Sequence, residues 1–190
     1  FNHLKEYIQI GGFPEAYKFG KAIIARIYED IITKDILLRY KINKIEELKR
    51  LTSYLITTSS QETTYSRLAE ILNIKQVSTI SNWINYLENT FLIFRVERFD
   101  YKLKQQFKAP KKFYGIDTGL INSIGWQYSD NLGRLIENVV AIELRRRKGL
   151  IYYWKNQQHE EVDFVIKNGK CVEELIQVTF ANNKTDIKER

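Results

Sequence analysis

The sequence offers very little for disulfide or zinc chemistry. Among its 190 residues there is one cysteine, and His3 and His159 are the only histidines. A single cysteine excludes an intramolecular disulfide, and so few thiols and imidazoles argue against a Cys/His zinc site. Cys171 follows a predicted turn, so we expect a buried or half-buried strand residue rather than a reactive thiol.

Long apolar runs are also missing. No segment is long enough to span a bilayer and there is no signal peptide, so we expect a cytoplasmic protein without a membrane partner. No glycine-rich loop ends in Gly-Lys-Ser or Gly-Lys-Thr, and ATP binding by that route is therefore not expected within this chain. Because the sequence begins at Phe1 and stops inside the polar stretch 182–190, we expect it to be part of a longer protein.

The charge balance is basic. Thirty Lys and Arg residues face 23 Asp and Glu residues, which gives a net charge of +7 and an isoelectric point near 9.3. With 44% apolar and 28% charged residues, the composition is typical of a globular protein. The surplus of positive charge favours a polyanion as partner, with DNA as the first candidate.

Hydrophobic spacing divides the chain into three predicted parts with an α+β fold. Residues 1–42 carry helical patterns that two glycines and a proline interrupt at 11–16. Residues 43–115 show three helical patterns and then two strand-like ones, an order that predicts a winged helix. The helices are expected at 45–59, 64–72 and 77–93, and the strands at 94–103 and 107–117.

The third part, residues 116–190, predicts a partial α/β domain. A long helix is expected at 130–149, because apolar residues recur at helical spacing and the pattern ends in four cations and a glycine. A strand at 150–156 and a hairpin at 160–180 follow, with a tight turn at Asn168 and Gly169.

In a helix-turn-helix the second short helix lies in the major groove of DNA. Here that helix starts at Val77, and its outward side chains can contact base edges; they are Ser78, Thr79, Asn82 and Asn85. We expect Trp83 in the core. The next segment contains lysines with no acid between them, which suits phosphate contacts: Lys102, Lys104, Lys108, Lys111 and Lys112. The alternative is a solvated lysine-rich loop in a module that only contacts proteins.

Two acids lie in unusually apolar surroundings. Glu137 is placed among leucine, isoleucine and valine in the long helix, and Asp163 lies mid-strand in the hairpin. A phosphodiesterase site needs such carboxylates around Mg²⁺ together with a cation for the phosphate. The second strand of the hairpin offers only Gln177 and Thr179, which supply neither a negative charge nor an ammonium group.

The pairing of the hairpin strands has two possible outcomes. A two-residue turn at Asn168 and Gly169 would place Asp163 opposite Glu174, on the other face from Gln177. A three-residue loop with a bulge would put Asp163 and Gln177 on the same face, because one residue of slip reverses every side chain. The sequence leaves both open.

Five ordered motifs carry a resemblance that covers nearly the whole chain. They are GGFPEA from residue 11, YEDIITKDI from 28, PKKFYGIDTGL from 110, GRLIENVVAIEL from 133, and EVDFVI followed by LIQVT in the hairpin. Together they resemble the C-terminal region of prokaryotic AAA+-superfamily P-loop ATPases. This resemblance implies an N-terminal ATPase domain that binds ATP and is joined to residues 1–42, then a winged helix, then a nuclease-like domain.

The nuclease-like domain is similar to the PD-(D/E)xK restriction-endonuclease and Holliday-junction-resolvase fold. The resemblance assigns the helix glutamate to Glu137 and the strand aspartate to Asp163, as catalytic residues and as Mg²⁺ ligands. The Glu-x-Lys of the family falls on Gln177 and Thr179, where this sequence departs. We therefore expect a degenerate catalytic site with weak Mg²⁺ binding at most, and the last helix and strand of that fold beyond Arg190.

The expected function is a DNA-binding, nuclease-like accessory region of an AAA+-type ATPase. Two alternatives stay open. One is a Mg²⁺-dependent DNA nuclease or resolvase. The other is a protein-interaction or oligomerisation module, which would contact its own ATPase domain or further copies of itself.

Overall fold

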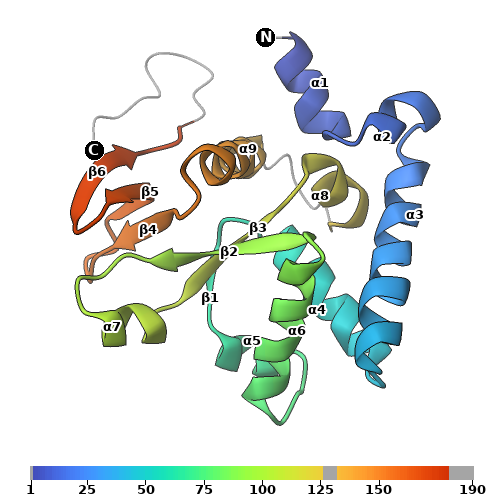
Figure 1. Cartoon of the computed structure of the whole chain (residues 1–190), viewed down its shortest axis with the longest axis horizontal. Coiled ribbons are helices and arrows are strands. Elements are labelled where there is room, and N and C mark those ends of the chain that lie inside the picture. Colours follow the sequence, from blue (N-terminus) through green and yellow to red (C-terminus); the bar gives the residue numbers. More distant parts are fainter. Residues whose placement is uncertain (1, 126–131, 180–190) are drawn as a thin grey trace.

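The computed structural model describes residues 2–125 and 132–179. Its centre is one mixed six-stranded sheet, with helices on both sides (Figure 1). The strands lie in the order β1 (Glu62–Thr63), β3 (Lys111–Gly115), β2 (Ile93–Arg98), β4 (Tyr152–Lys155), β5 (Glu161–Asn168) and β6 (Cys171–Ile176). The α+β class is confirmed. The sheet continues across the expected boundary at residue 115, because β2 pairs with β4 in parallel.

The N-terminal part is helical, as expected, and breaks at the predicted glycines. Helices α1 (Asn2–Ile10) and α2 (Pro14–Phe19) flank the break, and α3 (Ala22–Asp30) continues as the π-helix η1 (Ile31–Leu38). Gly11 has a φ of +90° and packs against the segment after β3. There the Gly12 amide donates a hydrogen bond of 2.5 Å to the Asp117 carboxylate. The turn at Gly11 and Gly12 and the segment at Asp117 therefore hold each other in place.

Replacing Gly11 by alanine is expected to destabilise the chain by about 3 kcal/mol or more. A Cβ at this position would lie 2.3 Å from the Asp117 carboxylate and 2.6 Å from the Gly119 amide nitrogen, so backbone must shift in addition to the cost of a positive φ. Gly149→Ala is the matched control, because φ is +77° there and no atom lies within 4 Å. Its cost is expected to be about 1 kcal/mol. Equal losses in urea unfolding would contradict the packing role of Gly11.

The middle of the chain follows the order helix, strand, helix, helix, strand, helix, strand. Helices α4 (Ile45–Thr57), α5 (Tyr65–Ile71) and α6 (Val77–Asn89) confirm the three predicted helices, and the Thr64 hydroxyl caps α5. The short strand β1 was not expected. The prediction of a strand through residue 103 is wrong at its end, because β2 stops at Arg98 and Leu103–Lys108 form helix α7.

The last part contains α8 (Thr118–Ile124), α9 (Leu132–Lys148) and strands β4 to β6. Helix α8 was not expected; the Asp117 side chain begins it by accepting a bond from the Leu120 amide. Helix α9 lies against the β4–β5–β6 end of the sheet, and α4, α5 and α6 gather on the other side (Figure 1). The polar pattern expected from residue 182 lies outside the described residues.

The hairpin combines a feature of each pairing alternative, a two-residue turn and a bulge. Its turn is at Gly169 and Lys170, one residue later than predicted, since Asn168 pairs with Cys171. Cys171 begins β6, as a strand residue was expected to, but it is exposed rather than buried, because it directly follows the turn. A register shift between Ile166 and Lys167 then brings Phe164 opposite Ile176. The bulge expected in the second alternative is therefore present, but it lies in the strand, and the turn has two residues rather than three. Asp163 and Gln177 lie beyond the last of these pairs, and Asp163 is buried whereas Gln177 is exposed.

Two apolar clusters make up the core. The larger lies among the helices of residues 10–93 and α8, and the smaller lies between α9 and the sheet. The smaller one includes Tyr114, Tyr153 and Phe164 and ends at a group of charged side chains, described below. The smaller core therefore borders a group of charged side chains around Lys112.

Candidate nucleic-acid interface and carboxylate cluster

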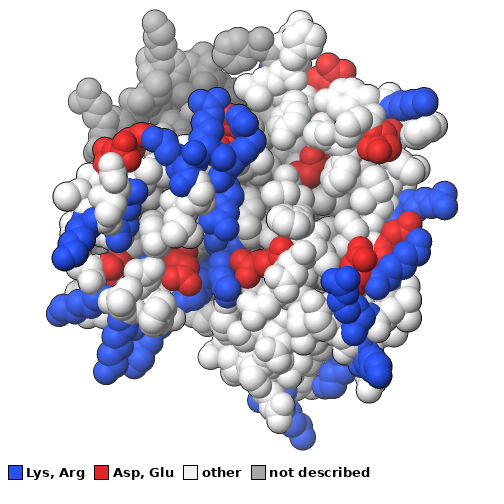
Figure 2. All heavy atoms as spheres, viewed as in Figure 1, with Lys and Arg blue, Asp and Glu red and all other residues white. Residues whose placement is uncertain are grey.

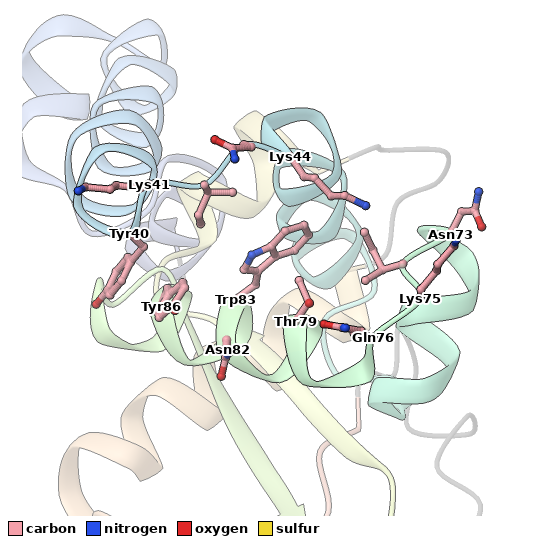
Figure 3. A pocket seen from close by; sticks show the side chains of 13 residues that line it. Tyr40, Lys41, Lys44, Asn73, Lys75, Gln76, Thr79, Asn82, Trp83 and Tyr86 are labelled. Atoms are coloured by element: carbon pink, nitrogen blue, oxygen red, sulfur yellow. The ribbon is translucent and has the colours of Figure 1, made fainter.

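A cleft opens beside the first turns of α6. One wall is the loop 41–44 and the other is α6 with the turn that precedes it, and the volume is about 620 Å³ (Figure 3). Of the predicted base-reading residues, Thr79 and Asn82 line this cleft, while Ser78 and Asn85 lie on α6 outside its lining. Trp83 is in the core, as expected, with 5% of its surface exposed.

Only positive charges line the cleft. Lys41, Lys44 and Lys75 are exposed, and no acid is among the described lining residues. Tyr40 and Tyr86 stack with ring centroids 3.6 Å apart, which holds the loop wall against α6. These three lysines were not predicted as site residues from the sequence. They occupy two separate short connections. The one feature of the sequence that could have pointed to them is that Lys75 lies in the turn between α5 and α6.

The predicted lysine-rich segment divides into exposed and buried members. Lys102, Lys104 and Lys108 are exposed on and beside α7, where basic side chains gather at the lower left of Figure 2. The expectation of an exposed loop is wrong for Lys111 and Lys112, which lie in β3 with 8% and 2% of their surface exposed. Strand β3 is buried along its whole length, so the side chains on both of its faces contact other buried or partly buried groups of the protein.

Lys111 closes the end of α7. Its ammonium group donates to the carbonyl oxygens of Phe107 at 2.8 Å and Ala109 at 2.7 Å, with Gln106 at 3.4 Å. Burial lowers the pKa of Lys111, and the nearby Glu97 carboxylate opposes that effect. A cation at the last carbonyls of a helix stabilises that end of the helix.

Lys112 lies at the centre of a cluster of carboxylates. Its Nζ is 2.5 Å from Glu161 Oε1, 3.3 Å from Glu137 Oε1 and 3.9 Å from Asp163 Oδ1. The structure thus brings together Glu137 and Asp163, the two acids singled out in the sequence. It adds Glu161 and an ammonium group from a distant strand, so the expectation of a site without an ammonium group is wrong.

Three local features aim these side chains at one point. Asn138, fully buried next to Glu137, donates to the Gly115 carbonyl at 2.8 Å and accepts from the Gly115 amide at 2.9 Å, which fixes α9 to β3. A bulge in β5 lies opposite Tyr153, between the pairs Tyr152–Val165 and Trp154–Val162. The Asp163 carboxylate also accepts a bond of 2.8 Å from the Val178 amide.

Burial and pairing set the ionisation of the cluster. Burial raises the pKa of Glu137, although Lys112 and the Tyr114 hydroxyl favour its charged form. For Glu161 burial also raises the pKa, but the hydrogen bonds and charges of Lys112 and Lys155 outweigh it and the net shift is downward. Burial lowers the pKa of Lys112, yet the surrounding carboxylates prevail and the net shift is upward. The ammonium group therefore stays charged.

The cluster does not suit a divalent metal ion. An ammonium nitrogen occupies the position between the three carboxylates, where Mg²⁺ would need oxygen ligands at about 2.1 Å. Within residues 2–125 and 132–179, no three His, Cys, Asp or Glu side chains form a group that could hold a metal. Gln177 and Thr179 are both exposed just beyond the end of β6, and the cation of the cluster is Lys112 from β3.

Fold and sites thus define an α+β chain with a lysine-lined cleft and a buried lysine–carboxylate cluster. The chain belongs to the family described as "Domain of unknown function (DUF8612)", whose model matches residues 1–130, and residues 132–187 match "Domain of unknown function (DUF4143)". The border between the two matches falls just before α9. No helix in the described part of the chain is long and apolar enough to cross a membrane.

Two relatives show the extent of the likeness. "Uncharacterized protein MJ1544" of Methanocaldococcus jannaschii is 34% identical over 203 residues, which covers 99% of this chain and 44% of that protein. An "Uncharacterized protein" of Haemophilus influenzae is 27% identical over 184 residues, covering 93% of this chain and 45% of that protein. The chain therefore spans less than half the length of these relatives. No solved structure matches it significantly.

Proposed function

We propose that this chain binds DNA without cutting it. The observation that carries the proposal is the cleft beside α6, whose described lining includes Lys41, Lys44 and Lys75 together with helix residues that suit base contacts, and no acid. Exposed lysines that converge on one cleft release counterions when they neutralise phosphates, which favours binding to any nucleic acid. Thr79 and Asn82 are placed beside these charges, and side chains of these types read base edges.

The topology supports a winged helix as the binding unit. Strand β3 lies between β1 and β2, and helices α4, α5 and α6 precede β2. With α5 and α6 as the helix-turn-helix, residues 99–110 between β2 and β3 are the wing, which carries Lys102, Lys104 and Lys108. We propose that α6 enters the major groove while the wing contacts the adjacent backbone.

We further propose that the DNA-binding region serves an ATPase. The family that matches residues 132–187 is typically found together with AAA ATPases. The relatives are more than twice as long as this chain, and ATP would bind in the part of such a protein that the chain does not span. In this proposal the chain positions the ATPase on DNA.

The order α9, β4, β5, β6 supports a nuclease-like origin for the last part, and the convergence of Glu137, Asp163 and Lys112 favours nuclease activity as a second candidate. The burial of the Lys112 ammonium group argues against nuclease activity. The ammonium group that would face a scissile phosphate belongs to a side chain with 2% exposure and is surrounded by carboxylates. With Glu62 and Lys155 included, four carboxylates face two ammonium groups, so the cluster repels phosphate.

The chain is expected to leave linear duplexes and four-way junctions intact with Mg²⁺ or Mn²⁺, and the Asp163→Asn variant is expected to behave identically. The readout is gel separation of end-labelled DNA, with a binding assay on the same samples to show that substrate was engaged. Metal-dependent cleavage by the wild type that Asp163→Asn abolishes would establish the nuclease and reject the non-cleaving proposal.

A further inference from the structure

The short helix α7 shows its apolar side chains to solvent. Tyr101, Leu103 and Phe107 are 81%, 65% and 67% exposed, although each is large enough to stabilise a core. Large apolar groups gathered on one small surface mark an interaction site more often than chance exposure does. We call these three side chains the wing platform.

The wing platform is held rigidly from below. Lys111, itself buried, binds the carbonyl groups at the end of α7, and the Gln106 amide donates to Glu97 Oε2 at 3.1 Å. The Lys102 amide donates to the Asp100 carboxylate at 2.8 Å and fixes the entry to the helix. A six-residue helix has little stability of its own, so these bonds keep it folded with its apolar side outward.

The most exposed ring is also fixed in orientation. Tyr101 meets Phe99 edge to face, with centroids 4.9 Å apart, and Phe99 in turn lies 6.3 Å from Tyr152. The Lys167 ammonium lies over both Phe99 and Tyr152, at 5.3 and 5.5 Å from their centroids. An ordered ring beside cations loses little conformational entropy when a flat ligand stacks on it.

Charge selects the partner. Three exposed lysines, Lys102, Lys104 and Lys108, alternate with the platform side chains, and residues 101–112 contain no acid. We propose that the wing platform stacks unpaired bases of a nucleic-acid strand while these lysines contact its phosphates. Base–aromatic stacking beside a cationic backbone track is how proteins hold single strands without sequence preference. The inference rests on the proposed DNA-binding function and names its substrate: DNA with an unpaired segment next to a duplex.

The test compares three fluorescein-labelled DNAs by anisotropy: a single strand, the matching duplex, and a duplex with a single-stranded tail. The double variant Tyr101→Ser/Phe107→Ser is expected to bind the single strand and the tailed duplex at least about tenfold more weakly, because each stacked base contributes about 1–3 kcal/mol. Its affinity for the blunt duplex is expected to stay within about threefold. The control is Phe19→Ser, which removes a ring that is 62% exposed from α2, far along the chain. Thermal unfolding checks that all variants fold.

Each outcome has a distinct meaning. Unchanged binding of all three DNAs by the double variant would overturn the wing platform while leaving the α6 cleft intact, and would point to a protein partner for α7. If the double variant loses the same affinity for blunt and for tailed DNA, the proposal that the platform stacks on unpaired bases is wrong. If the wild type binds none of the three DNAs, the proposed function itself fails and the inference falls with it.

Discussion

Lys112→Met is expected to lower the free energy of unfolding by about 3–5 kcal/mol, the largest stability effect of any lysine substitution within residues 2–125 and 132–179. Methionine fills a similar volume but leaves Glu137, Glu161 and Asp163 facing one another without the cation between them. Breaking a buried ion pair from one side costs more than the pair contributes, because the remaining charge is left without compensation. Chemical unfolding at neutral pH measures the loss.

The deficit of Lys112→Met should shrink as the pH falls. Without the ammonium group, mutual repulsion raises the pKa of the clustered carboxyl groups in the folded state. A carboxyl group whose pKa is higher in the folded state than in the unfolded state, near 4.5, stabilises the fold at pH values below the unfolded pKa. That stabilisation is lost as the pH rises through the folded-state pKa. The variant is therefore expected to approach the wild type in mild acid.

Two comparisons make the Lys112 result interpretable. Lys148→Met breaks a solvated pair with Glu174, 2.6 Å long, and should cost far less stability than Lys112→Met. The combination Lys112→Met/Glu161→Gln removes one charge of each sign and should recover part of the loss. A Lys112→Met deficit no larger than that of Lys148→Met would mean that the cluster is solvated and open, and would restore access to phosphate.

Replacing Lys41, Lys44 and Lys75 together by alanine is expected to give the largest loss of DNA affinity, at least about tenfold at moderate salt. Each phosphate contact contributes about 0.9 to the dependence of log affinity on log salt concentration, so the slope should fall by about half if the wing lysines supply the remainder. Anisotropy titrations of a labelled duplex at several salt concentrations give both values.

The matched control removes the same charge elsewhere. Lys5, Lys18 and Lys21 are exposed on or beside α1 and α2, away from the α6 cleft. Their triple alanine variant has the same net charge as the cleft variant, and we expect its slope to stay near that of the wild type. Equal slopes for the two variants would show that binding follows net charge alone, and that the cleft has no special role.

Local patterns in the sequence were sufficient for much of the architecture. The apolar spacing of α4, α6 and α9 predicted each helix, and the break at Gly11 appeared where the glycines and proline require it. Helix α7 was not predicted because six residues are too few to show a helical spacing of apolar side chains. Its C-terminal end also depends on a hydrogen bond from Lys111, which lies outside the helix. Propensity alone does not form so short a helix.

The candidate sites divide in the same way. Glu137 and Asp163 could be predicted because an acid in an apolar run is itself a signal. Lys112 could not, since its partners lie 25 to 51 positions away in the chain and meet it only after the sheet forms. The cleft lysines likewise come from two connections that only the packing of the loop 41–44 against α6 brings together.

The salt dependence of duplex binding by the wild-type chain tests the central claim most directly. Six exposed lysines line the α6 cleft and the wing, namely Lys41, Lys44, Lys75, Lys102, Lys104 and Lys108. If they contact phosphates, log affinity falls linearly with log salt with a slope of about −5. Absence of binding at low salt, or an affinity that salt leaves unchanged, would contradict DNA binding by this chain.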